Sequence, residues 1–477
     1  MNKFHKYSLV GVAFLALASC AVPKVNDIKK PMEIPVENAN QPTPQTESIS
    51  LKEFFADPEL QILFDEVVAA NPDFQIAQQR LEIANSFLQR SKMALLPSLE
   101  VGAVASMDHY GKYTTESIGN RETNATPGLD RSEQINENLN PNYWLGARSS
   151  WEIDAWGKLK SQKLAAQKRY LASEEGIRLI QVELFTNVAQ LYYQLIMLDK
   201  KLEIYQKNLK LQQKAYEIVK AQREVGKVTE LAVQQFKAQN NNILAELEYI
   251  KAEIVSNEKA IATLTGKYGT VVQRSSTLLP TQISILNQDM DINKIIHSRP
   301  DVAANYLVLE ASHADAKAAR AAFYPKIDLN ASLGLNSFNA GKLFSPSSLA
   351  GQLLGGFMVP IFNKGQLKHD FNVASKEQEI AFLTYQKSIT TAFNELQSVL
   401  KQMRIFEKVL TLKSEEVQSL DKGIVISNDL YITGYANYLE LINSQKSKLQ
   451  AELDMLQFQH QNTQNNILLF KALGGKL

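Results

Sequence analysis

Apolar residues in the central part of the chain recur at alternating steps of four and three. This heptad pattern comprises Leu184, Val188, Leu191, Leu195, Leu198, Leu202, Tyr205 and Leu209. Such a repeat predicts an amphipathic helix that packs along a continuous seam. A second apolar line beside the first comprises Met197, Ile204, Leu211 and Ile218. The apolar face is therefore too wide for a two-stranded coil, and we expect helical neighbours on both sides.

Proline is absent from two long tracts, residues 142–279 and 361–477. Because proline costs roughly 3 kcal/mol inside a helix, its absence over such lengths favours long helices. The first tract predicts a helix from Leu159 to Val225. Gly226 then has the position of a C-cap, and Thr229 that of an N-cap for a second helix running toward Gly266. Together these signals predict a long antiparallel helical hairpin.

The second tract repeats the first at a constant spacing. Gly226 and Gly434 are 208 positions apart, as are Gly157 and Gly365. Upstream, Pro97 and Pro325 are 228 positions apart, so the first copy carries twenty extra residues between Pro97 and Gly157. This regularity indicates an internal duplication. We expect a first repeat over residues 51–275 and a second over residues 276–477, each with a helix, a strand hairpin and a long helical hairpin.

Strict alternation of apolar and other residues follows Pro97 and Pro325. The apolar positions are Leu99, Val101, Ala103, Ala105 and Met107 in the first copy, and Ile327, Leu329, Ala331, Leu333 and Leu335 in the second. A period of two predicts strands. Return strands are expected from Tyr143 to Ile153 and from Leu353 to Ile361, joined to the first strands by loops at residues 109–141 and 337–351.

Four strands of this kind cannot close a membrane barrel by themselves. Each is about the ~9–11 residues that span an outer membrane, but the smallest such barrels have about eight strands, and open edges are not tolerated in lipid. After a cleaved N-terminal segment, no apolar run near the ~20 residues of a membrane helix is present. The sequence therefore predicts an oligomer whose subunits share one barrel and one helical tube.

The N-terminus has the features of a bacterial lipoprotein. Lys3 and Lys6 precede an apolar run, and Leu17-Ala-Ser-Cys20 follows it. We expect residues 1–19 to be a signal peptide and Cys20, the single cysteine, to be the lipidated residue. Residues 20–50 have a polar, proline-rich composition typical of a tether. Without Lys3 and Lys6 the chain keeps 49 basic side chains against 50 acidic ones, which argues against a nucleic-acid partner.

Three segments resemble the TolC-like outer-membrane efflux proteins, in particular their lipoprotein branch typified by OprM and NodT. They are Trp151-Glu-Ile-Asp-Ala-Trp-Gly-Lys-Leu159, the stretch from Arg299-Pro-Asp-Val302 through Ala318-Ala-Arg-Ala-Ala-Phe-Tyr-Pro325, and Val359-Pro-Ile-Phe-Asn-Lys-Gly-Gln-Leu367. The resemblance extends from about Leu51 to Leu477. It implies a mainly α protein with membrane β strands, in which a homotrimer forms a twelve-helix periplasmic α-barrel and a twelve-stranded outer-membrane β-barrel.

The resemblance also implies partners and a place in the cell. The chain would be lipid-anchored in the outer membrane, extend into the periplasm, and work with a periplasmic adaptor and an inner-membrane pump.

No catalytic motif, cofactor motif or paired metal-ligand spacing is present in the sequence, so we expect no enzyme and no cofactor. Outside the expected signal peptide, the histidines are scattered at His109, His297, His313, His369 and His460, and the nine methionines are dispersed along the chain, although a copper or silver exporter stays open.

The two hairpin turns are the candidate contact surface for the adaptor, because they end the helical tube farthest from the membrane. The candidate residues are Gly226, Lys227 and Thr229 in the first turn and Gly434, Tyr435 and Ala436 in the second. The alternative is that both glycines only cap helices. The resemblance places a constriction beside the second turn, which implies a periplasmic gate formed by Tyr431, Leu439, Glu440 and Asn443.

Glu440 and Asn443 leave the character of that gate open. Glu440 occupies a position that is acidic in some members of the family, whereas Asn443 stands where a carboxylate is common. If Glu440 faces the axis, three symmetry-related carboxylates would favour a bound cation. The equal alternative is that Glu440 is a solvated carboxylate on a helix face.

The favoured function is a passive exit duct for small toxic compounds. Two alternatives are a duct for protein secretion and a lipid-tethered periplasmic coiled-coil scaffold without a channel. The substrate is not encoded in this chain, because a water-filled tube selects mainly by size and charge.

The three tryptophans have two possible roles. Trp144, Trp151 and Trp156 could belong to a membrane-interface belt or pack the junction of sheet and helices, and for Trp156 we expect packing.

Overall fold

The computed structural model describes residues 22–32, 34, 51–136, 139–269, 271–278 and 291–475. Two compact units make up the chain. One contains all four strands and consists of residues 1–29, 83–170 and 307–382; the other consists of residues 30–82, 171–306 and 383–477. Each unit therefore draws on both halves of the sequence, so the spatial units differ from the two expected repeats.

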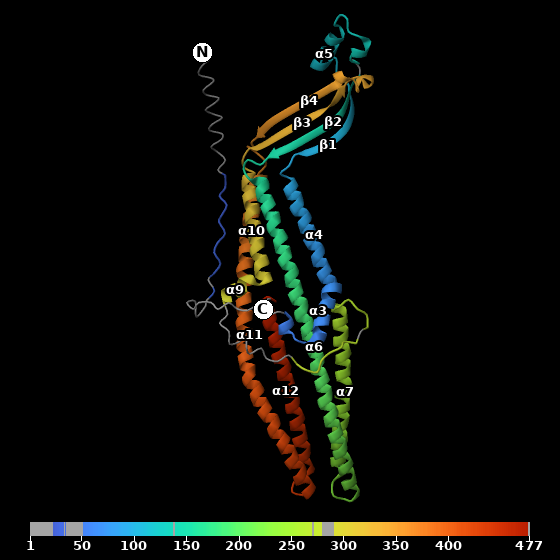
Figure 1. Cartoon of the computed structure of the whole chain (residues 1–477), viewed down its shortest axis with the longest axis vertical. Helices are drawn as coiled ribbons and strands as arrows, with labels where there is room; N and C mark the ends of the chain where they lie inside the picture. The colour runs from blue at the N-terminus through green and yellow to red at the C-terminus, as the bar shows by residue number, and fades with distance from the viewer. Residues whose placement is uncertain are drawn as a thin grey trace. The chain divides into compact units, whose positions relative to one another are not determined.

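Two long helical hairpins follow the expected pattern (Figure 1). Helix α6 spans Lys158–Glu224 and α7 spans Glu230–Leu264, within one residue of the predicted ends of the first long helix. Helix α11 spans Gln366–Thr433 and α12 spans Tyr438–Ala472. Among the helices that the structure describes, none is both long and apolar enough to cross a membrane.

The elements of the two halves correspond residue by residue. Helices α7 and α12 each have 35 residues and begin 208 positions apart, and α6 and α11 have 67 and 68 residues at the same spacing. Upstream, α4 (Pro72–Met93) and α10 (Pro300–Ala321) each have 22 residues and begin 228 positions apart. The spacing of prolines and glycines therefore predicted the duplication correctly.

Short helices complete the described chain. They are α2 (Leu51–Phe54), α3 (Pro58–Ala70), α5 (Thr115–Asn124) and α9 (Ile292–Ser298), with 3-10 turns η1 (Arg131–Glu133), η2 (Ala340–Lys342) and η3 (Pro346–Ser348). Asp57 caps α3, since its carboxylate accepts a hydrogen bond from the backbone N–H of Glu59 at 3.1 Å. The long loop after β1 contains α5 and η1, so it is partly helical rather than wholly irregular.

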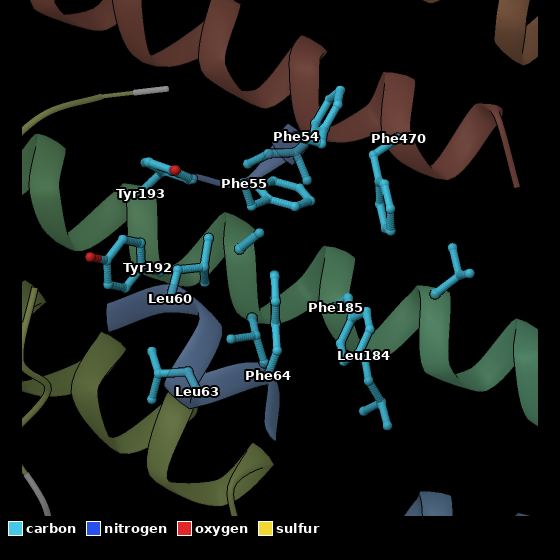
Figure 2. Packing of buried hydrophobic residues seen from close by; sticks show 14 of the residues in the cluster. Phe54, Phe55, Leu60, Leu63, Phe64, Leu184, Phe185, Tyr192, Tyr193 and Phe470 are labelled. Carbon is cyan, nitrogen blue, oxygen red and sulfur yellow. The ribbon is translucent and has the colours of Figure 1, made fainter. Parts of the chain in front are cut away.

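The main hydrophobic core lies where α2 and α3 pack against the middle of α6 and the end of α12. Phe54 from α2, Phe55 directly after it, Phe64 from α3 and Phe470 from α12 are fully or almost fully buried there, and Figure 2 shows these rings beside Phe185. The rings of Phe64 and Phe185 have centroids 4.5 Å apart. In the second apolar line predicted for α6, Met197 is buried and Ile204 half-buried, whereas Leu211 and Ile218 are exposed, so the wide apolar face is covered along only part of the helix.

The four strands form one antiparallel sheet in the order β1-β2-β3-β4 (Figure 1). They are β1 (Ser98–Asp108), β2 (Asn140–Ile153), β3 (Lys326–Ser337) and β4 (Leu349–Met358). The register pairs Leu99 with Ser149, Trp151 with Leu329, and Ile327 with Phe357. Successive side chains alternate between faces, so this register places the predicted apolar positions of β1 and β3 on one face.

The two faces of the sheet differ sharply in chemistry. On one face the register aligns Val101, Ala147, Leu333 and Gly351, together with the rest of the apolar series. The other face carries Glu100, Arg148, Ser332 and Gln352 in a single row. An apolar face and a polar face on strands of this length are typical of a membrane barrel wall, with the apolar face toward lipid.

The predicted return strands require correction at their ends. Strand β2 begins at Asn140 instead of Tyr143, because β1 continues to Asp108 and pairs with it. Strand β4 covers 349–358, not 353–361: its ladder opens with Leu349 opposite Leu335 and closes with Met358 opposite Lys326. Pro360 has no N–H to donate and lies beyond the ladder. The second loop therefore ends at Ser348, not at Gly351.

The tryptophans do not form one belt. Trp144 lies on the polar face of the sheet, whereas Trp151 lies on the apolar face, where it pairs with Leu329. Trp156 packs as expected: its ring stacks on Tyr324 with centroids 5.1 Å apart, and its indole N–H donates to the carbonyl of Pro325 at 2.7 Å. A single interfacial belt of all three was the wrong alternative.

Part of the expected tether has defined contacts. The carbonyl of Asn26 accepts a hydrogen bond from the Gln378 side chain at 3.0 Å, and Lys29 lies 3.9 Å from the carboxylate of Glu379. Asn26 and Lys29 thus contact α11. The expected signal peptide at 1–19, the lipidation site Cys20, and most of the tether lie outside the described residues.

Candidate gate and hairpin tips

The first hairpin tip is a tight turn built on Gly226. This glycine has a φ of 74°, a conformation that strains residues with a side chain. Its N–H donates to the carbonyl of Arg223 at 3.0 Å, and the N–H of Lys227 donates to the carbonyl of Gln222 at 2.9 Å. These two bonds define a Schellman motif, which ends α6 as the sequence predicted.

The second tip repeats this backbone geometry. Gly434 has a φ of 85°, its N–H donates to the carbonyl of Tyr431 at 3.2 Å, and the N–H of Tyr435 donates to that of Leu430 at 2.8 Å. The helix starts differ, however. Thr229 occupies the N-cap position of α7 without a side-chain hydrogen bond, whereas the Asn437 side chain accepts from the N–H groups of Leu439 and Glu440 at 2.9 and 3.1 Å.

Both tips expose apolar side chains. Val225 is 70% exposed in the first tip, and Tyr435 is 86% exposed in the second, with Ile432 beside it at 70%. Lys227 and Thr229 are also exposed, while Ala436 is half-buried. An exposed aromatic and aliphatic side chain on a rigid turn is the kind of group that anchors a protein interface.

A hydrogen bond links the second hairpin to the first near these tips. The phenol of Tyr431 on α11 donates to the side-chain carbonyl of Gln222 on α6. Burial raises the pKa of Tyr431 above its usual value, so the phenol remains a protonated donor at neutral pH. Tyr431 was a predicted gate residue, but nothing in the sequence indicated Gln222 as its partner.

Deeper between the hairpins, α6 and α12 make a second polar contact. The Gln212 amide donates to the side-chain carbonyl of Gln445 at 2.8 Å, with both residues buried. An apolar cluster lies nearby, formed by Ala215, Val219, Ala232, Val233, Phe236 and Ile442. Ile442 therefore anchors α12 against both helices of the first hairpin.

The other predicted gate residues lie near the start of α12 and are exposed, unlike the buried Ile442. Leu439 is 44% exposed, and Glu440 and Asn443 are exposed as well. The carboxylate of Glu440 also accepts a hydrogen bond of 3.5 Å from the side-chain amide of Asn437, the N-cap residue of α12. Glu440 thus has a local structural role, and its exposure leaves it accessible to a cation.

Among the described residues, no cluster of three histidine, cysteine or acidic side chains is placed to hold a metal ion. Three contacts link the hairpins near Tyr431, and we call them the latch: one hydrogen bond near the tips, one buried amide pair, and one apolar anchor. A latch of this size can part without unfolding either hairpin, because each bond contributes only about 1 kcal/mol net.

Comparison with known proteins gives consistent matches over nearly the whole chain. The model of the outer membrane efflux protein family matches residues 63–267 and 292–475. The solvent efflux pump outer membrane protein SrpC of Pseudomonas putida is 27% identical over 477 residues, covering 98% of each chain. The cation efflux system protein CusC of Escherichia coli K12 is 25% identical over 422 residues, covering 88% of each chain.

Solved structures share the fold. The outer-membrane channel OprN superposes with a TM-score of 0.82 at 21% identity, covering 95% of this chain and 99% of that one. A crystal structure of CusC gives a TM-score of 0.80 at 23% identity, covering 94% and 99%. The helical hairpins and the four-stranded sheet described above are therefore the common architecture of these channels.

Proposed function

The chain belongs to the outer membrane efflux protein family, and on that premise we propose that it is the exit duct of a tripartite efflux system. It lies in the outer membrane and extends into the periplasm. An inner-membrane pump supplies the energy and a periplasmic adaptor connects the pump to the duct, so the chain itself conducts passively. No reaction is catalysed.

The observation that carries this proposal is the two-faced sheet with unpaired edges. Within the described chain, β1 and β4 each have a ladder partner on one side only, and the apolar face has no charged residue in any of its four strands. Open edges in lipid leave backbone groups without hydrogen bonds, at a cost of several kcal/mol each. We infer that β1 and β4 of neighbouring subunits pair, and that three copies give a twelve-stranded barrel above a twelve-helix tube.

We further propose roles for the N-terminus and the repeats. Residues 1–19 are removed, Cys20 carries the lipid, and residues 20–50 tether it to two repeats over 51–275 and 276–477. Acyl chains anchor a protein without specifying subunit contacts. A Cys20→Ala variant behind a cleavable signal is therefore expected to form the same trimer, and a variant that stays monomeric in detergent would show that the lipid is needed for assembly.

The hairpin tips and the latch have separate roles in this proposal. Gly226, Lys227, Thr229, Gly434, Tyr435 and Ala436 form the adaptor-contacting surface. Tyr431, Leu439, Glu440 and Asn443 form the periplasmic gate. The support is the exposure of most of these side chains on the tips and the start of α12, together with the Tyr431–Gln222 bond that links the second hairpin to the first near its tip.

Planar-bilayer recording of the purified protein tests the proposal. We expect discrete ion-conducting steps, and a trimer that migrates differently on gels before and after heating. A lipid-tethered coiled-coil scaffold would show neither property. A gate-opening variant such as Tyr431→Phe should be recorded in parallel, so that a closed but intact channel is not mistaken for a scaffold.

The cargo is proposed to be small toxic compounds. The two curated relatives are named for solvent and for cation efflux, and a shared duct serves both because the pump chooses the substrate. Cells that lack the chain should become sensitive to such compounds while their extracellular proteins stay unchanged. Loss of a secreted protein without any change in sensitivity would favour a protein-secretion duct instead.

A further inference from the structure

The polar face of the sheet contains a row of residues without bulky side chains. The register aligns Gly102, Gly146, Gly334 and Ala350 across all four strands. At Gly146 and Gly334 the backbones approach so closely that an added Cβ would lie 2.5 Å from backbone atoms of the neighbouring strand. This row therefore leaves a shallow strip of wall that larger neighbours can cover.

Trp144 fills that strip. A Cβ placed on Gly146 would meet the Trp144 indole at 3.0 Å, and one placed on Gly102 would meet it at 3.9 Å. The ring consequently lies along the wall instead of standing away from it. Arg148, two residues further on the same face of β2, holds its guanidinium carbon 4.1 Å from the centroid of this ring, a cation–π contact.

The charge on Arg148 has no other partner in the described part of the chain. Its side chain is exposed, and Glu100, opposite it on β1, forms no ion pair with it there. The other basic residue on this face, Lys326, lies 2.9 Å from Asp328 and 3.4 Å from Glu152. Arg148 is thus an unneutralised cation on a face whose remaining charges, including Asp108, are acidic.

We propose that the Trp144–Arg148 pair sets the charge selectivity of the barrel by presenting a fixed guanidinium to solutes in the lumen. The inference rests on the proposed function, because the polar face lines a lumen only when the strands close into a barrel. Guanidinium donors left free by a cation–π contact bind carboxylate and phosphate groups. Three such groups per trimer counter the acidic residues of the wall and allow anionic solutes to pass.

Reversal potentials across a KCl gradient test this in planar bilayers. A fixed charge about 8 Å from a passing ion changes its local concentration roughly twofold at low salt. We expect R148Q to shift the cation-to-anion permeability ratio about twofold toward cations and R148K to retain the parental ratio. W144L should give a smaller shift in the same direction, because the released guanidinium can turn toward Glu100.

Arg131→Gln is the matched control, since Arg131 is an exposed arginine in the loop between β1 and β2, outside the sheet. An unchanged ratio in R148Q, or an equal shift in the Arg131 variant, would overturn the proposal. An unchanged ratio in W144L would remove Trp144 from it. The recordings are repeated in the Tyr431→Phe background, and if neither protein conducts ions, the proposed duct fails rather than the selectivity element. Trimer migration on gels shows that each variant has assembled.

Discussion

The two helical hairpins share one backbone design but differ in the side chains near their tips. Both end their long helix with a Schellman turn on glycine, at Gly226 and Gly434. In the first tip, Arg223 at the end of α6 forms an ion pair of 2.9 Å with Glu230 at the start of α7, within the same hairpin. At the position of Arg223 in the second repeat stands Tyr431, which instead bonds to Gln222 on the other hairpin. The two halves therefore share the turn, while tyrosine in place of arginine links the second hairpin to the first.

The largest expected effect on export comes from a substitution at the second hairpin tip. We predict that Ala436→Glu abolishes export. Burying one unpaired charge in an adaptor interface costs about 2 kcal/mol, or roughly 30-fold in affinity. Export by intact cells measures the effect, with trimer level and surface amount as controls.

Val228→Glu is the matched change in the first hairpin, at the same position of the repeat. A smaller loss there would show that the adaptor relies more on the second tip. Unchanged export in the Ala436 variant would leave both glycine turns with a capping role alone.

The Tyr431–Gln222 bond gives the next largest effect. Tyr431→Phe removes about 1 kcal/mol of latch energy, so the open population should rise roughly fivefold. Single-channel conductance and open probability measure this change. Tyr435→Phe, on an exposed tyrosine of the same tip, is the control, and a Gln222→Leu variant should add little to Tyr431→Phe. If the double variant opens far more than either single one, the two residues do not act as one bond.

Glu440 and Asn443 should tune the block by divalent cations. We expect Glu440→Gln to raise the cation concentration for half-block roughly threefold, and Asn443→Asp to lower it, because the electrostatic attraction of the gate changes by one charge per subunit. Gln235→Asp places a carboxylate at the repeat position of Asn443 in the first hairpin and serves as the control. Equal block in the parent and in Glu440→Gln would assign Glu440 to helix capping only.

The smallest effect concerns the helix starts. Asn437 caps α12 with its side chain, while Thr229 makes no such bond. Thr229→Asn should therefore stabilise the first turn of α7 by about 0.5 kcal/mol, and Asn437→Thr should weaken that of α12 by a similar amount. Amide hydrogen exchange at these turns measures both changes. Equal protection of the parent turns would contradict the difference in capping.

Local signals explain which parts of the fold could be predicted. The ends of α6 followed from the absence of proline and from Gly226, and β1 and β3 followed from strict alternation after Pro97 and Pro325, because each of these signals acts within a few residues. The ends of β4 were missed, since Gly351, Gly355 and Gly356 interrupt its apolar pattern and its limits depend on pairing with β3.

The candidate site shows the same division. Tyr431 could be proposed from a resemblance, but the Gln222 and Gln212–Gln445 contacts depend on how α6, α11 and α12 rotate against one another. No spacing within one helix encodes that rotation. Alternation along β2 likewise places Trp144 on the polar face. Its contact with Arg148, however, depends on Gly146 on the same strand and Gly102 on β1, which leave room for the ring.

The open edges of the sheet have a genetic consequence. The proposed barrel, closed only by neighbouring subunits, tolerates no defective member, because one distorted β1 or β4 leaves a seam unpaired. If half of the chains in a cell carried such a defect, only about one trimer in eight would contain none, since three subunits are drawn at random. Alleles that damage the edges should therefore be dominant over the normal copy, whereas alleles that prevent synthesis should be recessive.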